Sequence, residues 1–221
     1  MSNDTLTHWL PELMKITAAE INDKLYEWLS PIDRKRFTCL YARLEKVVAW
    51  KSPNKGKKAK TDQGRRSRLI GRLYERLLVV LFTARGGLSV ETNLRNTTSE
   101  IDLLLKVEPS GLALPLLRDV GPHVVGEAKC HANPPSSQLV NEMVAFLQTV
   151  SAKLGLLFVF CSSRVLKSEV RTAIAIHSAR GTIIVPVGRK QLEAVRDGAP
   201  IMRVLSTQRV DAENHLTKLA I

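Results

Sequence analysis

The chain has 221 residues, 44% of them hydrophobic, and a formal net charge of +12. A chain of this length and apolar content can bury one good core and an accessory segment, so an intrinsically disordered protein is excluded. The excess of positive charge favours a polyanionic partner, most simply nucleic acid, over a charge that serves solubility alone.

The cysteines and the apolar runs indicate the cellular setting. Cys39, Cys130 and Cys161 form no CxxC pair and are odd in number, so neither a disulfide scaffold nor a zinc site is expected, and a reducing compartment fits better. No basic segment followed by an apolar run opens the sequence, so no signal peptide is expected. The apolar runs at 77–82 and 154–161 are too short to span a bilayer. We therefore expect a cytoplasmic protein without membrane contacts.

Residues 1–50 predict an N-terminal helical hairpin. An apolar stripe between Ile16 and Leu29 ends before Ser30-Pro31, which suits the N-cap and first position of a second helix. That helix repeats its apolar face from Phe37 to Val48. Two such helices cannot bury both stripes alone. We therefore expect them to dock on the rest of the chain or to form the interface of a homodimer.

Residues 51–68 differ in composition from their surroundings and predict a flexible basic linker. Eight Lys or Arg residues stand against one Asp, with one Pro, two Gly and no large apolar residue. A simple tether needs no such charge, whereas a polybasic segment attracts phosphates by counterion release. The candidate nucleic-acid contacts are Lys55, Lys57, Lys58, Lys60, Arg65, Arg66 and Arg68.

A domain over 69–221 is expected to begin with a buried helix and two strands. The segment 69–84 is apolar on most sides, with Leu69, Leu73, Leu77 and Leu81 on one face. Strands are expected at 88–94 and 99–107, and a loop at 108–122 suits an antiparallel connection to the next strand. Asp102 is the one charge among Ile101 and three following leucines, where propensity and burial both disfavour a carboxylate.

The next strand, within 123–131, carries two charges on one side. Side chains alternate along a strand, so Glu127 and Lys129 point the same way and Ala128 points the other way. Taken alone, the two charges are typical of a surface pair on an edge strand. With Asp102 on another apolar strand, a buried charged site is favoured instead, because a charge that leaves water must be paired or must bind a metal.

The remaining chain alternates helices and strands. A helix from Ser136 or Ser137 to about Lys153 is expected, followed by a buried strand at 155–161. A helix at 166–179, a strand at 182–187 and a short helix at 190–196 complete the pattern, which predicts a mixed sheet flanked by helices. The expected inner face of the first of these helices consists of Leu139, Met143, Phe146, Leu147 and Val150.

Three motifs in this order resemble the PD-(D/E)xK nuclease superfamily, and more narrowly its Mrr-like restriction endonuclease group. They are Gly71-x-x-Tyr-Glu75 on a helix, Glu-Ile-Asp102 in an apolar strand and Glu127-Ala-Lys129 after a hydrophobic run. The resemblance covers roughly residues 64–190. Ile101 stands where the family has a proline. The resemblance implies an α/β fold with a restriction-endonuclease-like αβββαβ core, to which the N-terminal helical hairpin is added.

The resemblance also implies a metal-dependent DNA endonuclease of the restriction or phage-defence type, with Mg²⁺ as cofactor and Mn²⁺ as a substitute. Asp102 and Glu127 would bind the metal with the Ala128 carbonyl, and Lys129 would act on the attacking water or on the phosphate. Glu75 would join through a water or a second metal, or would instead pair with a nearby arginine. Such a metal neutralises the scissile phosphate and lowers the pKa of a bound water.

Two alternatives to a restriction-type enzyme stay open. The same chemistry serves structure-selective repair or junction-resolving nucleases, and the site could be vestigial in a DNA-binding module. Gln138 is a candidate polar helper or a helix cap, and His131 is a loop histidine or a phosphate contact. The sequence has no P-loop motif, so any energy-dependent activity would need partner subunits of a defence system. Cutting two strands needs two sites, which favours a homodimer.

Overall fold

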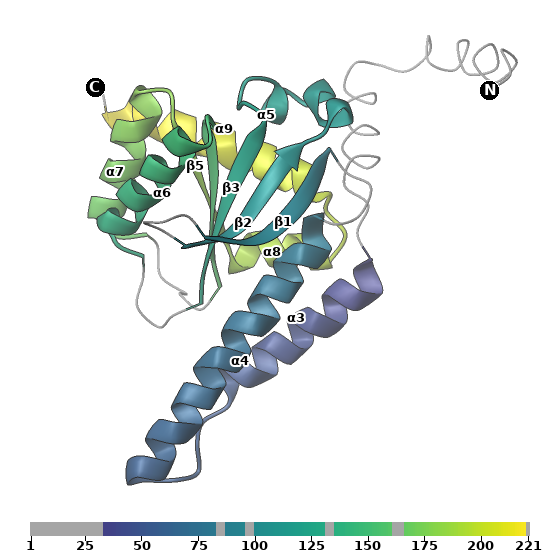
Figure 1. The fold of residues 1–221 in the computed structure, drawn as a ribbon, viewed down its shortest axis with the longest axis vertical. Helices are drawn as coiled ribbons and strands as arrows, with labels where there is room; N and C mark the ends of the chain where they lie inside the picture. Colours follow the sequence, from purple (N-terminus) through teal and green to yellow (C-terminus); the bar gives the residue numbers. More distant parts are fainter. Residues whose placement is uncertain (1–32, 83–86, 96–99, 131–134, 161–165, 220–221) are drawn as a thin grey trace, which may run out of the picture.

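The computed structural model describes residues 33–82, 87–95, 100–130, 135–160 and 166–219, which form one sheet with helices on both faces (Figure 1). The first expected helix, the Ser30-Pro31 break and His131 lie outside the described residues. No described helix has the length and apolar character needed to cross a membrane.

The helices and strands follow one another in the order expected, with additions near the middle and at the end. The strands are β1 (Leu88–Arg95), β2 (Glu100–Val107), β3 (His123–Lys129), β4 (Leu154–Val159) and β5 (Ile183–Gly188). The helices are α3 (Arg34–Ala49), α4 (Gly56–Phe82), the 3₁₀ helix η1 (Pro109–Ala113), α5 (Pro115–Arg118), α6 (Ser137–Thr149), α7 (Ser168–Ala179), α8 (Arg189–Arg196) and α9 (Ile201–Leu219). The expected loop at 108–122 thus contains η1 and α5, and α9 was not predicted.

The sheet is mixed, and every strand pairs with its neighbour in sequence. Its order is β1-β2-β3-β4-β5. Strand β2 is antiparallel to both of its neighbours, β1 and β3, whereas β3, β4 and β5 run parallel. The antiparallel connection expected across 108–122 is therefore confirmed, as are the α/β class and the mixed sheet.

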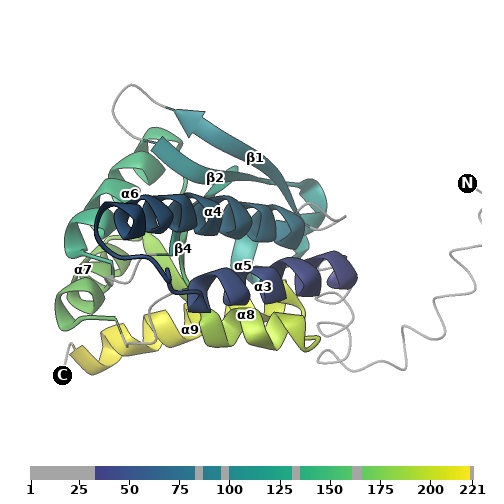
Figure 2. The ribbon, with the colours of Figure 1, turned by 90° about the horizontal axis from the view of Figure 1, so that it is seen from below.

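The two faces of the sheet are covered by different helices (Figure 2). Residues of α6 and α7 form one apolar cluster with one face, while residues of α3, α4, α5, α8 and α9 cover the other. Strand β4 is buried throughout and divides its side chains between the two clusters. This agrees with the expectation of a strand buried on both faces.

Helix α6 lies close to the sheet because of a glycine in β4. A Cβ atom on Gly155 would lie 2.7 Å from Ile184 Cδ1 and 2.8 Å from Met143 Cε. Ser136 is the N-cap of α6, where its side chain accepts a hydrogen bond of 3.3 Å from Leu139 N. The buried face of the helix includes Val140 instead of Leu139, so it is rotated slightly from the expected stripe.

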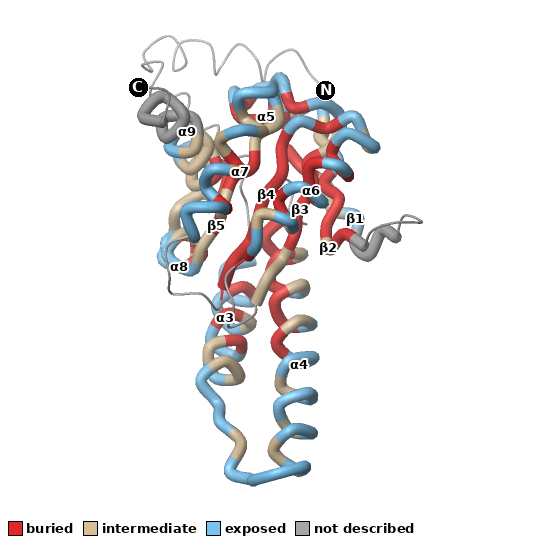
Figure 3. The backbone as a smooth tube through the Cα atoms, turned by 90° about the vertical axis from the view of Figure 1, so that its left-hand side faces the viewer, coloured by how far each residue is buried: buried red, intermediate tan, exposed pale blue. Residues whose placement is uncertain are grey.

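The prediction of a flexible linker over 51–68 is wrong. Helix α4 begins at Gly56 and continues without interruption to Phe82. Its first buried residue is Ile70, so the preceding turns project from the core, as the pale blue lower end of Figure 3 shows. The prediction also placed Leu69 in the core, but Leu69 is 39% exposed.

The projecting part of α4 and the turn before it are held by polar contacts, and we call residues 50–69 the arm. The Asp62 carboxylate accepts hydrogen bonds of 2.7 Å from both Ser52 Oγ and Asn54 Nδ2. Arg66 donates to the carbonyl oxygens of Val47, at 2.9 Å, and Val48. These carbonyls belong to the last turn of α3, whose final carbonyl groups have no partner within the helix. The arm is helical because its Lys, Arg and Gln residues favour helix and because these contacts fix its start.

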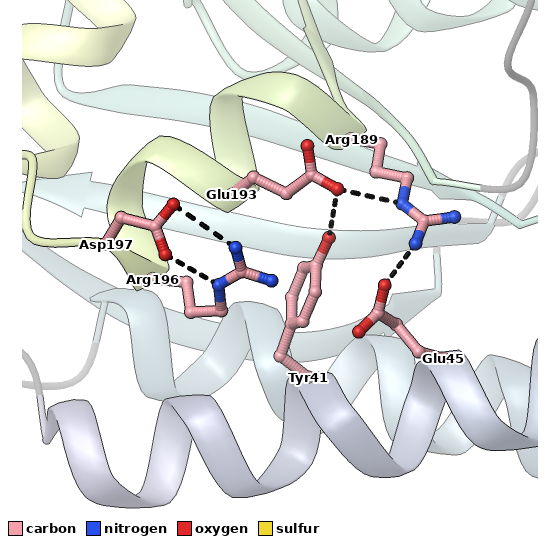
Figure 4. A network of polar contacts seen from close by, with 6 residues as sticks. All are labelled: Tyr41, Glu45, Arg189, Glu193, Arg196 and Asp197. Carbon is pink, nitrogen blue, oxygen red and sulfur yellow. Dashed lines mark hydrogen bonds and ion pairs between the residues drawn. The ribbon is translucent and has the colours of Figure 1, made fainter.

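Helix α3 docks on both α4 and α8. Phe37, Tyr41 and Leu44 are fully buried in the larger apolar cluster. Figure 4 shows the polar part of this contact, in which the Tyr41 hydroxyl donates to Glu193 Oε1 at 3.3 Å. Arg189, which opens α8, donates to the same oxygen at 3.1 Å and pairs with Glu45 of α3 (Figure 4). Of the two expectations for this helix, docking on the rest of the chain is therefore observed.

Candidate active site

The site lies where strands β2 and β3 separate. Their ladder ends with the pair Leu103 and Gly126. One residue before Leu103 in β2, the carboxylate of Asp102 accepts a hydrogen bond of 2.7 Å from Ala128 N. A side-chain oxygen thus replaces the backbone carbonyl that a continued ladder would supply. Asp102 is therefore held between the two strands, and not simply on one face of the sheet.

Glu127 carries the buried charge of the site. It is 7% exposed and is the only buried charged residue among those described. Its Oε1 atom pairs with Lys129 Nζ, as the alternation of β3 predicts. Burial raises the pKa of Glu127, the negative charge of Asp102 raises it further, and Lys129 opposes both effects. Asp102 and Glu127 are therefore close enough to repel each other.

The ammonium group of Lys129 stays charged in this surrounding. Burial acts to lower the pKa of Lys129, but the hydrogen bond and charge of Glu127, with Asp102 and Glu142, raise it above its usual value. Glu142, on α6, was not predicted as a site residue. Gln138, the candidate polar helper, donates a hydrogen bond of 2.8 Å to Glu142 Oε1 and so contacts a neighbour of the site. It is not the helix cap, because Ser136 is the N-cap of α6.

A cavity of about 70 Å³ lies on the opposite side of Asp102, between α4 and the strand ends. It is lined by Ser67, Gly71, Tyr74, Glu75, Asp102, Ala128 and Cys130. Glu75 and Asp102 therefore line one space, whereas Glu127 and Lys129 are not among its lining residues. Ala128 points to this side, away from Glu127 and Lys129. Cys130 forms a disulfide bond, contrary to the expectation of reduced cysteines.

Tyr74, the tyrosine of the Gly71-x-x-Tyr-Glu75 motif, also lines this cavity, although the sequence analysis assigned it no role. Its side chain is 1% exposed and packs against Phe160, with ring centroids 5.6 Å apart. Its hydroxyl is buried and has no hydrogen-bond partner among the described residues. Burial raises the pKa of the Tyr74 hydroxyl well above its usual range, with smaller contributions from Tyr41 and Asp102. A buried hydroxyl without a partner costs about 1–3 kcal/mol, so an external partner is favoured at this position.

The donor set fits a divalent cation that takes few protein ligands. Asp102 and Glu127 are two neighbouring carboxylates, and Lys129 offsets only part of their charge. Mg²⁺ is commonly bound through one or two carboxylates and keeps several of its waters. Within the described residues, no group of three or more His, Cys, Asp or Glu side chains is arranged to hold a metal. Further ligands would therefore be waters, backbone oxygens or substrate.

The predicted nucleic-acid contacts lie on the arm and differ in their surroundings. Lys55, Lys57, Lys58, Lys60, Arg65 and Arg68 are exposed. Arg66 is half-buried and bonded to the end of α3. Six of the seven candidates are thus accessible to a ligand, and Arg66 has a structural role.

Comparison with protein-family models, curated proteins and solved structures found no match to this chain. What the site can do is therefore inferred from its residues and their geometry.

Proposed function

We propose that the chain is a metal-dependent DNA endonuclease of the restriction or defence type, with a PD-(D/E)xK-like core of the Mrr-like group. The observation that carries the proposal is the pair of carboxylates at the separation of β2 and β3, with Lys129 beside Glu127. The element order and the mixed sheet are compatible with the αβββαβ core that the motifs imply.

Each residue has a role that its position supports. Asp102 and Glu127 would hold a divalent cation, which when bound supplies positive charge to the scissile phosphate and lowers the pKa of a water. The ammonium group of Lys129 lies beside Glu127 and would orient the attacking water or bind a phosphate oxygen. Glu75 lines the same cavity as Asp102 and would hold a water there.

The arm supplies the charge for binding DNA. Asp62 is the one acidic residue in the sequence of the arm, among several exposed Lys and Arg residues. Its carboxylate already accepts hydrogen bonds from Ser52 and Asn54. The part of α4 within the arm buries no residue, and exposed helices of a few turns are marginal in water. A polyanion would relieve the repulsion among these cations and stabilise the arm as it binds.

The test is cleavage of supercoiled plasmid, linear duplex and four-way junction DNA with Mg²⁺ or Mn²⁺, with wild type and Lys129→Ala side by side. Cleavage by wild type alone supports the proposal, and a preference for junctions would indicate a repair-type or junction-resolving enzyme. If wild type leaves every DNA intact under these conditions, the proposed endonuclease activity is wrong.

One contact favours a second candidate, a DNA-binding module with a vestigial site. The Lys129 ammonium group already pairs with a Glu127 oxygen that a metal would use. Calorimetric titration with Mn²⁺ separates the two candidates. Binding that Asp102→Asn removes supports a metal site, whereas no binding to wild type supports the module.

A further inference from the structure

Two glycines in the interior of α4 are not required by packing against the part of the chain that the structure describes. A Cβ atom on Gly64 or on Gly71 would meet none of its atoms within 4 Å. Glycine in a helix interior lowers helix stability relative to alanine, because it loses more conformational freedom on folding. Both positions therefore cost stability, and no neighbour in the structure requires them to be glycine.

The two glycines lie on one face of the helix. Residues seven apart differ by only about 20° around a helix, so Gly64 and Gly71 nearly coincide in direction. Ser67 lies between them at helical spacing. We call these three residues the glycine face. Ser67 and Gly71 line the cavity that contains Asp102, and Gly64 continues the same face one turn outward.

Cations lie next to this face. Lys60 and Arg68 are each four residues from Gly64, about 40° to either side of it, and both are exposed. Lys60 therefore continues the face outward, whereas Arg68 borders it and its Nε donates to the Gly64 carbonyl oxygen at 3.4 Å. At the inner end, Tyr74 lines the same cavity, and its buried hydroxyl has no hydrogen-bond partner among the described residues. Small residues along one face, cations next to them and a buried polar group near the inner end describe a path for a narrow, anionic chain.

We propose that the glycine face is the track along which the sugar-phosphate backbone of a nucleic-acid strand reaches Asp102. Because glycine has no side chain, the sugar-phosphate backbone can approach the helix closely at these positions. Lys60 and Arg68 bind its phosphates. The cavity of about 70 Å³ is far smaller than the roughly 300 Å³ of a typical ligand pocket, so it receives a phosphate oxygen or its water and not a base. This inference rests on the proposed function, because it takes the bound strand to be DNA.

The test uses added bulk at constant charge. Gly71→Ala and Gly71→Leu are compared with Leu69→Phe, which adds bulk at an exposed position on the opposite side of the same helix, about 160° around from Gly71. DNA binding is measured by fluorescence anisotropy in EDTA, and folding by urea unfolding. We expect Gly71→Ala to raise the folding equilibrium constant by about fivefold.

DNA affinity should change in the opposite direction. We expect it to fall by at least about fivefold in Gly71→Ala, and by more in Gly71→Leu, with the affinity of Leu69→Phe unchanged. Wild-type affinity in both Gly71 variants, at unchanged fold, overturns the track. An equal loss in Leu69→Phe also overturns it, because the effect would then not belong to this face.

Tyr74→Phe provides a second test, at the inner end of the proposed track. It removes only the hydroxyl, and Tyr41→Phe is the control because that hydroxyl is bound to Glu193 outside the cavity. We expect DNA affinity to fall in Tyr74→Phe and not in Tyr41→Phe. If wild type binds DNA with this dependence yet cleaves none, the endonuclease proposal fails and the track stands. If wild type cleaves and the Gly71 variants match it, the track alone fails.

Discussion

The carboxylate of Asp102 accepts a hydrogen bond of 2.7 Å from the backbone amide of Ala128, at the point where the ladder between β2 and β3 ends. One residue therefore serves both the sheet and the candidate site. The two roles can be separated by the choice of substitution, because an amide oxygen keeps the acceptor but lacks the charge.

Asp102→Asn is expected to unfold at nearly the wild-type urea concentration and to lose Mn²⁺ affinity by at least about tenfold. Asp102→Ala removes the acceptor as well, so it should lower the free energy of unfolding by about 1–3 kcal/mol. Urea unfolding in EDTA and calorimetric Mn²⁺ titration measure the two effects. Equal stabilities of the two variants would contradict the role assigned to the Ala128 amide.

The Glu127–Lys129 pair predicts an asymmetry between its two partners. Lys129→Met leaves the Glu127 carboxylate buried without its cation, whereas Glu127→Gln leaves a lysine that is partly exposed to water. We expect the lysine variant to lose more stability, by less than the about 3–5 kcal/mol typical of fully buried pairs. Urea unfolding compares them, with Lys153→Met as an exposed control. A greater loss in Glu127→Gln would show that the lysine, and not the glutamate, depends on the pair.

Neighbouring arginines of the arm should give different phenotypes. Arg66→Ala removes the donors to Val47 and Val48, so it should lower the thermal unfolding temperature. Arg68→Ala should leave stability nearly unchanged and weaken DNA binding, with the slope of log affinity against log salt reduced by about 0.9 for the lost phosphate contact. Anisotropy at several salt concentrations and thermal melts check both. A salt slope unchanged in Arg68→Ala would remove this residue from the DNA interface.

The raised pKa of Tyr41 predicts that the protein loses stability at high pH. Burial first, and then the charge of Glu193, raise the pKa of Tyr41 to about 12. The folded state therefore favours the neutral phenol. The resulting stabilisation is complete below the unfolded-state pKa near 10 and is lost as the pH rises through about 12, by at most about 3 kcal/mol. Unfolding at about pH 9 and about pH 11 should show a steeper loss in wild type than in Tyr41→Phe. Parallel losses would indicate that Tyr41 is not the group responsible.

The strands were predictable from the sequence, and the arm was not. Apolar runs bounded by Gly, Pro and polar residues mark β2 through β5 closely, because burial in a sheet leaves a periodic or continuous apolar pattern. The arm has no such pattern. Its lysines and glycines suggested a flexible chain, while its helix depends on Asp62 and on the contact of Arg66 with α3, which are tertiary interactions.

The site residues likewise divide into those that the sequence indicates and those that only the structure shows. Asp102, Glu127 and Lys129 stood out because charges interrupt apolar strands. Tyr74 belongs to the Gly71-x-x-Tyr-Glu75 motif, but no role was predicted for it, since a tyrosine in an apolar helix is ordinary. Glu142 was not found at all, since a glutamate on a helix surface is equally ordinary. Their relation to the site arises only from how α4 and α6 lie on the two faces of the sheet.

The strand order β1-β2-β3-β4-β5 has a consequence for how the chain folds. Each strand pairs with the one made just before it, so the sheet can be assembled in the order of synthesis, with only the segment between neighbouring strands to close at each step. Asp102 and Glu127 meet when β3 joins β2, before α6, β4 and β5 have been added. The two carboxylates are thus placed early, and the elements that bury Glu127 arrive afterwards.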